Sequence, residues 1–139
     1  MTLTIHGVGL SRTLHVLCTA EELGLAYDHD PISFDDPALK SDAFLRLNPA
    51  GAIPVIEDDG FALPESLAIN LYLTKKPGTG GLYPATLEGE AEVWRWSLWA
   101  QGQMEPWVMH DFNLVPLREA LAPHAPPVMP RVSPRLSGT

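Results

Sequence analysis

A proline stands second in a short apolar run, Ile53-Pro54-Val55-Ile56, and limits what this run can become. The run has the composition of a buried strand, but proline has no backbone N–H to donate to a sheet. Pro54 therefore indicates one of two things: an ordinary trans proline at the start of a strand, or a cis peptide bond. The cis form is confined almost entirely to bonds that precede proline, where it costs only about 0.5–1 kcal/mol.

Composition excludes several classes of protein. The 139 residues give room for one domain, or for one small domain and part of another, and 45% of them are hydrophobic. The net charge of −8, with basic residues scattered along the chain, argues against a nucleic-acid partner. No apolar run is long enough to cross a membrane and the N-terminus does not resemble a signal peptide. We therefore expect a cytoplasmic protein without a membrane partner.

The single cysteine, Cys18, excludes an internal disulfide, a CxxC redox pair and a multi-cysteine zinc site. His110 and Asp111 are neighbours without a third ligand at metal spacing. We therefore predict no metal site, and we expect Cys18 to be a small buried residue.

The hydrophobic pattern predicts a βαβ unit followed by a ββα unit within about 76 residues. Strands are expected at 3–6, 26–33, 53–57 and 61–63, and helices at 42–47, at 65–75 and from an N-cap at Ser11 to Leu23. Gly24 is expected to end this first helix. The predicted core-facing residues are Leu14, Leu17, Cys18 and Leu23 in the first helix and Leu67, Ile69, Leu71 and Tyr72 in the last.

Four stretches together carry a resemblance to a known family. They are Ser11-Arg12, EELGLAYD (21–28), LNPAGAIPVIEDDG (47–60) and LPESLAINLYL (63–73). In this order and spacing the chain resembles the N-terminal domain of cytosolic glutathione transferases over nearly all of residues 3–76. The resemblance implies an α/β thioredoxin-like fold with a mixed four-stranded sheet, and glutathione as co-substrate.

The resemblance also implies how glutathione is held. It favours a cis bond before Pro54, and it assigns the backbone of Ile53 to the cysteine of glutathione. It assigns Ser66 to the γ-glutamyl carboxylate and Glu65 to the amino group of glutathione. A helix N-terminus offers unpaired N–H groups and a partial positive charge, which suits a carboxylate. The alternative is that Glu65 and Ser66 merely open the helix.

The catalytic group is predicted at the start of the first helix. The implied chemistry is attack by the glutathione thiolate, so a donor must lower the pKa of a thiol that is ordinarily near 8.5. Ser11 occupies the region where the family carries a catalytic Ser, Tyr or Cys, and Arg12 adds positive charge. The alternative is that Ser11 is only an N-cap and that the backbone N–H groups of residues 10–12 stabilise the thiolate.

Two departures from the family pattern concern the glycyl end of glutathione and the second domain. Many members carry Gln or Lys where this chain has Ala52, and Lys40 is the candidate replacement. VWRWSLWAQGQMEPW (93–107) resembles the start of the family's helical second domain, but the proline-rich sequence after Ala122 does not resemble its continuation. We therefore expect an incomplete all-α region with exposed tryptophans.

The expected organisation has four parts. They are a glutathione-binding domain (1–76), a linker (77–86), a partial helical domain (87–121) and a disordered tail (122–139). Within the helical part, one helix is expected at 87–105, broken by Pro106, and another at 107–121 with a kink near Pro116.

Three functions compete. The first is a homodimeric glutathione transferase that conjugates glutathione to small hydrophobic electrophiles. The second is a catalytically weak or inactive glutathione-binding and dimerisation module, which the truncated second domain and Ala52 favour. The third is a thiol–disulfide enzyme with Cys18 as nucleophile, disfavoured because Cys18 lies deep in its helix, away from the N–H groups that lower a thiol pKa.

Overall fold

The fold comes from a computed structural model, which describes residues 2–76, 78 and 81–108. The chain separates into two compact units, Met1–Trp94 and Arg95–Thr139. The four-part division expected from the sequence stays a prediction. In the parts of the chain that the structure describes, no helix is both long and apolar enough to span a bilayer.

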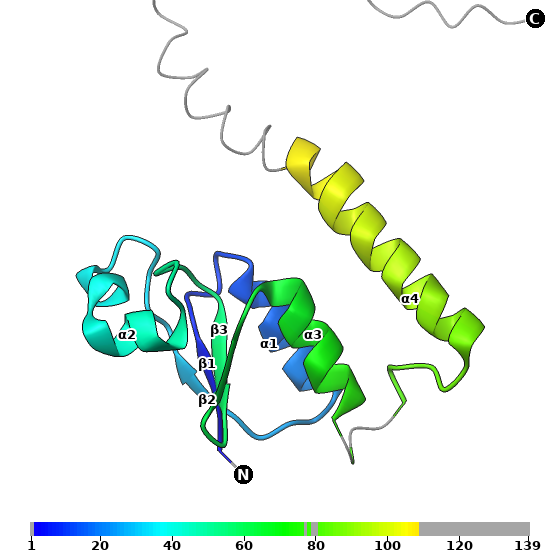
Figure 1. The fold of residues 1–139 in the computed structure, drawn as a ribbon, viewed down its shortest axis with the longest axis horizontal. Coiled ribbons are helices and arrows are strands. Elements are labelled where there is room, and N and C mark those ends of the chain that lie inside the picture. The colour runs from blue at the N-terminus through cyan, green and yellow to red at the C-terminus, as the bar shows by residue number, and fades with distance from the viewer. Residues whose placement is uncertain (1, 77, 79–80, 109–139) are drawn as a thin grey trace, which may run out of the picture. The chain divides into compact units, whose positions relative to one another are not determined.

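A four-stranded mixed sheet forms the centre of the first unit (Figure 1). Its strands lie in the order β2-β1-β3-β4, with bounds β1 (Leu3–His6), β2 (Asp28–Asp30), β3 (Val55–Asp58) and β4 (Phe61–Pro64). β1 runs parallel to β2 and antiparallel to β3, and β3 runs antiparallel to β4. This topology confirms the predicted thioredoxin-like fold.

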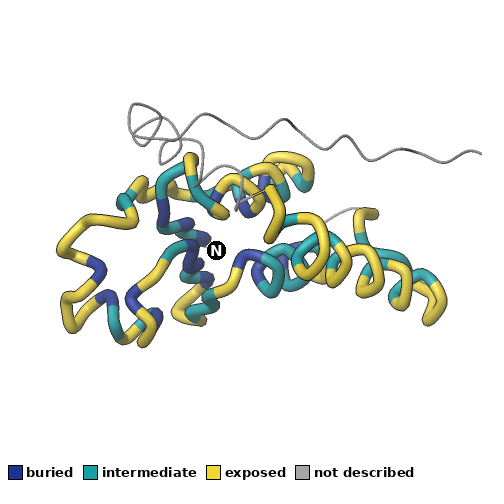
Figure 2. The backbone as a smooth tube through the Cα atoms, turned by 90° about the horizontal axis from the view of Figure 1, so that it is seen from above, coloured by how far each residue is buried: buried dark blue, intermediate teal, exposed yellow. Residues whose placement is uncertain are grey.

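Helices cover both faces of this sheet (Figure 1). α1 (Thr13–Glu22) and α3 (Ser66–Lys75) pack against each other and against one face, while η1 (Pro37–Lys40) and α2 (Asp42–Leu47) cover the other. Neighbouring residues of a strand contribute to the cores on opposite faces of the sheet, because side chains alternate along a strand. Ile56 joins the α1–α3 core and Val55 joins the α2 core. In Figure 2 the buried positions are dark blue; within the sheet they belong to the central strands β1 and β3, whereas β2 and β4 contain none.

The start and the core face of α1 differ from the prediction. The helix begins at Thr13, after the N-cap residue Arg12, whose side chain makes no capping hydrogen bond, so Ser11 lies one position before the cap. The buried residues are Thr13, Val16 and Ala20, whereas Leu14 is 52% exposed and Cys18 is exposed. The prediction of a buried Cys18 is therefore wrong. Once Val16 and Ala20 face the sheet, residues two positions away point to the opposite side.

Several other bounds also differ. β2 is shorter than expected because Pro31 follows it at once, and β3 begins at Val55, so Pro54 precedes the ladder. The Ile53–Pro54 peptide bond is cis. In α3 the fully buried apolar residues are Ile69 and Leu73, while Leu67 and Leu71 are only partly buried. The expected bounds of α2 and the stop at Gly24, whose φ is +63°, are confirmed.

The helical region begins with α4 (Leu87–Trp99), which has no buried residue. A π turn over Ala100–Met104 follows, and residues 105–108 continue as helix, so the predicted break at Pro106 is wrong. Proline cannot donate to the carbonyl four residues earlier, and the looser π turn directly before Pro106 accommodates this loss.

The four tryptophans are exposed, as expected. Several predictions lie outside the described residues: linker residues 77 and 79–80, the helix beyond 108 with Pro116, the His110-Asp111 pair, and the tail after residue 121.

Candidate functional site

A cleft of about 140 Å³ lies between the N-terminus of α3, the segment that leads into β3, and the loop before α1. Six of the eight predicted site residues line it, although they come from three distant parts of the sequence. Its lining consists of Arg12, Asn48, Ala52, Ile53, Pro54, Glu65 and Ser66. Ser11 and Lys40 lie outside this lining.

The N-terminus of α3 gives the cleft its polar end. Ser66 opens the helix and is only 7% exposed, yet its hydroxyl makes no hydrogen bond to any described residue. The first N–H groups of a helix have no partner within it, so they are available beside this hydroxyl. A group that carries negative charge is therefore stabilised here.

Glu65 precedes Ser66 in an unusual backbone conformation. Its φ is +75°, which is rare for a residue other than glycine, and its side chain makes no capping hydrogen bond. Such conformations cost about 1–3 kcal/mol and are concentrated at ligand-binding sites. The exposed carboxylate of Glu65 lies next to the cleft end that attracts anions, so the two neighbours offer opposite partners to a zwitterion.

The opposite wall is formed by the segment before β3. The backbone N–H and C=O of Ile53 have no hydrogen-bonding partner among the described residues. The side chain of Asn48 bonds to the backbone at Ala50 and Ala52. Sequence reasoning treated Asn48 only as the end of a helix and missed it as a lining residue. An Asn after a helix and before Pro49 is typical of a side chain that bonds to a following turn, and this signal could have found it.

Lys40 contacts the segment that forms this wall but does not line the cleft itself. Its Nζ donates to the carbonyl of Gly51 at 3.3 Å, beside Ala52. Gly51 has a φ of +57°, and a Cβ there would lie 2.9 Å from the Leu39 carbonyl oxygen. Glycine is therefore required where the loop turns against η1.

Ser11 is engaged with the backbone beside the cleft. Its hydroxyl donates to the Val8 carbonyl at 2.7 Å, lies 2.8 Å from Thr13 Oγ1, and accepts from the Thr13 N–H at 3.1 Å. The loop is tightly packed here, because a Cβ on Gly7 would lie 2.1 Å from Thr13 Oγ1. Ser11 thus shapes the start of α1, while its neighbour Arg12 lines the cleft.

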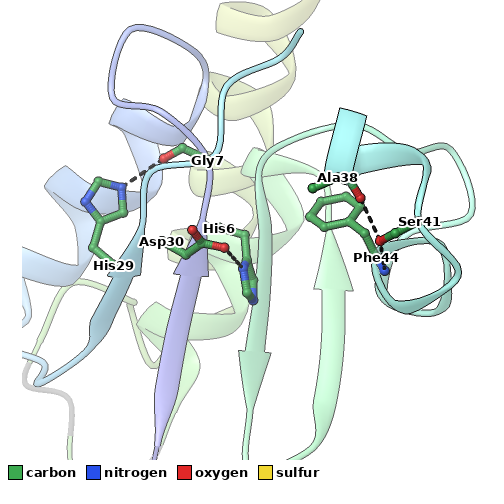
Figure 3. A network of polar contacts seen from close by, with 7 residues as sticks. All are labelled: His6, Gly7, His29, Asp30, Ala38, Ser41 and Phe44. Carbon is green, nitrogen blue, oxygen red and sulfur yellow. Dashed lines mark hydrogen bonds and ion pairs between the residues drawn. The ribbon is translucent and has the colours of Figure 1, made fainter. Parts of the chain in front are cut away.

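Two histidines fix the strand ends from which this loop departs (Figure 3). His6 Nδ1 lies 2.9 Å from a carboxylate oxygen of Asp30, and His29 Nε2 lies 2.8 Å from the Gly7 carbonyl. Because a carbonyl only accepts, His29 must carry its proton on Nε2. The ring centroids of His6 and Phe44 also lie 6.2 Å apart, with the two rings nearly perpendicular. These contacts tie β1, β2 and α2 together beneath the loop.

The same figure shows how α2 begins. Ser41 caps this helix: its hydroxyl accepts from the Phe44 N–H at 3.2 Å and donates to the Ala38 carbonyl at 2.7 Å. The Ser41 hydroxyl is thus fully engaged at its helix start, whereas the Ser66 hydroxyl makes no hydrogen bond to a described residue.

A buried charge cluster, which the sequence did not reveal, lies outside the cleft at the far end of β3. Asp58 accepts from Lys76 Nζ at 2.7 and 2.5 Å and from the Tyr72 hydroxyl at 2.8 Å. Burial alone would raise the pKa of Asp58, but the hydrogen bonds from Lys76 and Tyr72 outweigh it and hold the pKa below its ordinary value. A larger open cleft of about 480 Å³ adjoins this cluster.

Within the described residues, no group of three His, Cys, Asp or Glu side chains could hold a metal ion. Cys18 lies on the exposed side of α1 and does not line the cleft. The polar and charged parts of the cleft lining include Arg12 and the N-terminus of α3.

Comparison with known proteins places these observations in context. Residues 12–76 match the family described as glutathione S-transferase, N-terminal domain. Glutathione S-transferase 3 of Zea mays is 38% identical over 96 residues, which cover 66% of this chain and 43% of that protein. The chain spans between 36% and 46% of the length of the four relatives compared.

Solved structures agree with this match. The theta class glutathione S-transferase from Xanthomonas axonopodis pv. citri, with glutathione bound, has a TM-score of 0.67 and 30% identity, covering 75% of this chain and 50% of that one. Glutathione transferase F7 from Populus trichocarpa has a TM-score of 0.71 and 31% identity, and the match covers 84% of this chain and 58% of that one.

Proposed function

Because the chain belongs to the glutathione S-transferase family, we propose that its cleft binds glutathione and presents the glutathione thiolate to small hydrophobic electrophiles. The observation that carries the proposal is the convergence of six predicted residues on one cleft. The electrophile and a homodimeric assembly belong to this proposal as well.

The γ-glutamyl end of glutathione fits the N-terminus of α3. Its carboxylate would accept hydrogen bonds from the unpaired helix N–H groups and from the Ser66 hydroxyl, which has no other described partner. Its ammonium group would pair with Glu65, whose carboxylate lies at the same end of the cleft. Together these contacts fix the orientation of the ligand.

The cysteine of glutathione fits the Ile53 wall, where a backbone N–H and C=O are available. The thiol then needs a positive environment to ionise near neutral pH. Arg12 supplies a cation in the cleft lining. For Ser11 to donate to the thiolate, its hydroxyl would have to give up its bond to the Val8 carbonyl. The glycyl carboxylate would meet Ala52, with Lys40 as the nearest predicted cation.

A second function is a glutathione-binding and dimerisation module without turnover. The observation that favours it is Ala52 in the cleft lining, because its methyl side chain offers no polar contact to the glycyl carboxylate. A thiol–disulfide enzyme that uses Cys18 is not proposed, because Cys18 lies outside the cleft lining.

Calorimetric titration with glutathione and a conjugation assay with an aryl halide test the proposal. We expect binding to the wild-type chain, and about tenfold weaker binding by Ser66→Ala, because one hydrogen bond to a charged group is lost. Ser41→Ala is the matched control, since it removes a serine from another helix start outside the cleft. A wild-type chain that does not bind glutathione would contradict the proposal, and binding without conjugation would favour the second function.

A further inference from the structure

Asn48 ties together the loop that forms the Ile53 wall. It follows α2, is only 7% exposed, and bonds with both ends of its carboxamide. Its Nδ2 donates to the Ala52 carbonyl at 2.8 Å, and its Oδ1 accepts from the Ala50 N–H at 3.1 Å. Its own carbonyl accepts from the Gly51 N–H at 2.8 Å. A single residue therefore engages three successive loop residues.

The bond to the Ala52 carbonyl has a consequence for Ile53. The Ala52 C=O and the Ile53 N–H belong to one planar trans peptide unit, so they point in opposite directions. When Asn48 Nδ2 holds the carbonyl, the Ile53 N–H is directed away from the carboxamide. This N–H has no partner among the described residues. The orientation of the donor in the cleft wall is therefore set by the side chain of Asn48.

Other groups hold the loop less directly. Lys40 Nζ reaches the Gly51 carbonyl at the longer distance of 3.3 Å, and its side chain is exposed. The described side-chain bonds to the Ala52 carbonyl include only that of Asn48. Loss of the carboxamide therefore frees the peptide unit that carries the Ile53 donor.

We propose that Asn48 is a positioning residue for the cleft: its carboxamide fixes the Ala52–Ile53 peptide unit and thereby sets the affinity for glutathione. The statement about affinity rests on the proposed function, whereas the statement about the peptide unit rests on the hydrogen bonds alone.

Asn48→Asp provides the sharpest test because it keeps the shape and the Oδ acceptor but replaces the Nδ2 donor. The new carboxylate oxygen would face the Ala52 carbonyl oxygen at the 2.8 Å now spanned by a hydrogen bond, so the two would repel. We expect about tenfold weaker glutathione binding near neutral pH, where the carboxylate is ionised. On acidification the protonated carboxyl becomes a donor, and affinity relative to wild type at the same pH should recover. Asn48→Ala should bind weakly at both pH values.

Asn70→Ala is the matched control, since it removes the carboxamide of a partly buried asparagine outside the cleft. Amide hydrogen exchange at Ala50 and Gly51 and the free energy of unfolding are measured for every full-length variant. Faster exchange at Ala50 is expected in Asn48→Ala, and unchanged glutathione affinity in Asn70→Ala.

The inference is overturned if Asn48→Asp binds glutathione as tightly as wild type near neutral pH, or if its affinity does not recover on acidification. A lower free energy of unfolding with unchanged affinity would likewise overturn it, because a purely structural asparagine predicts that result. If wild type itself does not bind glutathione, the proposed function fails. Exchange at Ala50 then still decides the role of Asn48 in the loop: unchanged exchange in Asn48→Ala refutes it.

Discussion

Replacing Lys76 with methionine removes the cation from the buried cluster at the end of β3 and keeps a side chain of similar length. The Asp58 side chain is 2% exposed and that of Lys76 is 13% exposed, so little water can compensate for the lost charge. The carboxylate would keep the Tyr72 hydroxyl, at 2.8 Å, as a neutral donor. A buried charge would therefore be left without its counter-ion.

Such a change is expected to lower the free energy of unfolding by about 3–5 kcal/mol. That is a large part of the roughly 5–15 kcal/mol by which domains are usually stable. The neighbouring residue supplies a matched control: Lys75 pairs with Glu90 at 2.9 Å, but these side chains are 54% and 35% exposed. Lys75→Met should therefore cost far less stability, because water screens this exposed pair.

The pH dependence of stability follows from the direction in which the pKa of Asp58 is shifted. Because the pKa of Asp58 lies below its ordinary value in the folded protein, its contribution to stability is present above the unfolded pKa. That contribution is lost as the pH falls through the folded pKa. Without Lys76, burial still raises the pKa of Asp58, while one of the contacts that lower this pKa is lost. The stability difference between wild type and Lys76→Met should therefore narrow on acidification from about pH 7 to about pH 3.

Urea denaturation followed by far-ultraviolet circular dichroism measures these differences. A loss in Lys76→Met that is no larger than the loss in Lys75→Met would refute the argument from burial. A difference from wild type that stays constant over the pH range would refute the electrostatic origin of the effect.

Three further predictions concern the segment around α1. Gly7→Ala should lower the free energy of unfolding by at least about 3 kcal/mol, because its Cβ would lie 2.1 Å from Thr13 Oγ1. Gly24→Ala, whose Cβ would have no atom within 4 Å, should lower it by about 1 kcal/mol. Thermal unfolding of the two variants measures the difference. Ser11→Ala should cost about 1 kcal/mol in stability and slow conjugation, and an unchanged rate would move the thiolate role to Arg12 or to backbone N–H groups. Cys18 should react with a disulfide reagent in the folded protein nearly as fast as in the unfolded chain, and protection would contradict its exposure.

The residues of the cleft could be predicted from the sequence because they occur in short motifs whose spacing is set locally. Glu65 and Ser66 open a helix, and Ile53-Pro54 precede a strand, so each group's place follows from its own segment. The convergence of the segments follows from the order of strands and helices. The resemblance to a family supplied that order in advance.

The core face of α1 could not be decided from periodicity. Leu14, Leu17 and Cys18 form one apolar stripe and Val16 and Ala20 another, and both have helical spacing. The structure buries Val16 and the small Ala20 and leaves Leu14 exposed. Which stripe faces inward depends on the surfaces of α3 and the sheet, and these exist only after folding.

Pro106 and Asn48 show two further limits. A rule about proline ends the helix at Pro106, but a change to π winding over five residues lets it continue. Asn48 looked like a stop signal, whereas its main partner is a carbonyl four residues further along a turned loop. Neither the altered winding nor the loop closure is encoded in a local residue preference.

The placement of the aromatic residues decides what fluorescence can report on this protein. Its four tryptophans, at positions 94, 96, 99 and 107, all belong to the helical region that begins with α4, and the sheet and α1–α3 contain none. Tryptophan emission therefore reports on the surroundings of residues 94–107 rather than on the whole chain. An unfolding curve recorded by emission follows the helical region, and a curve recorded by circular dichroism follows the whole chain. A difference between their midpoints would show that the helical region and the rest of the chain unfold separately.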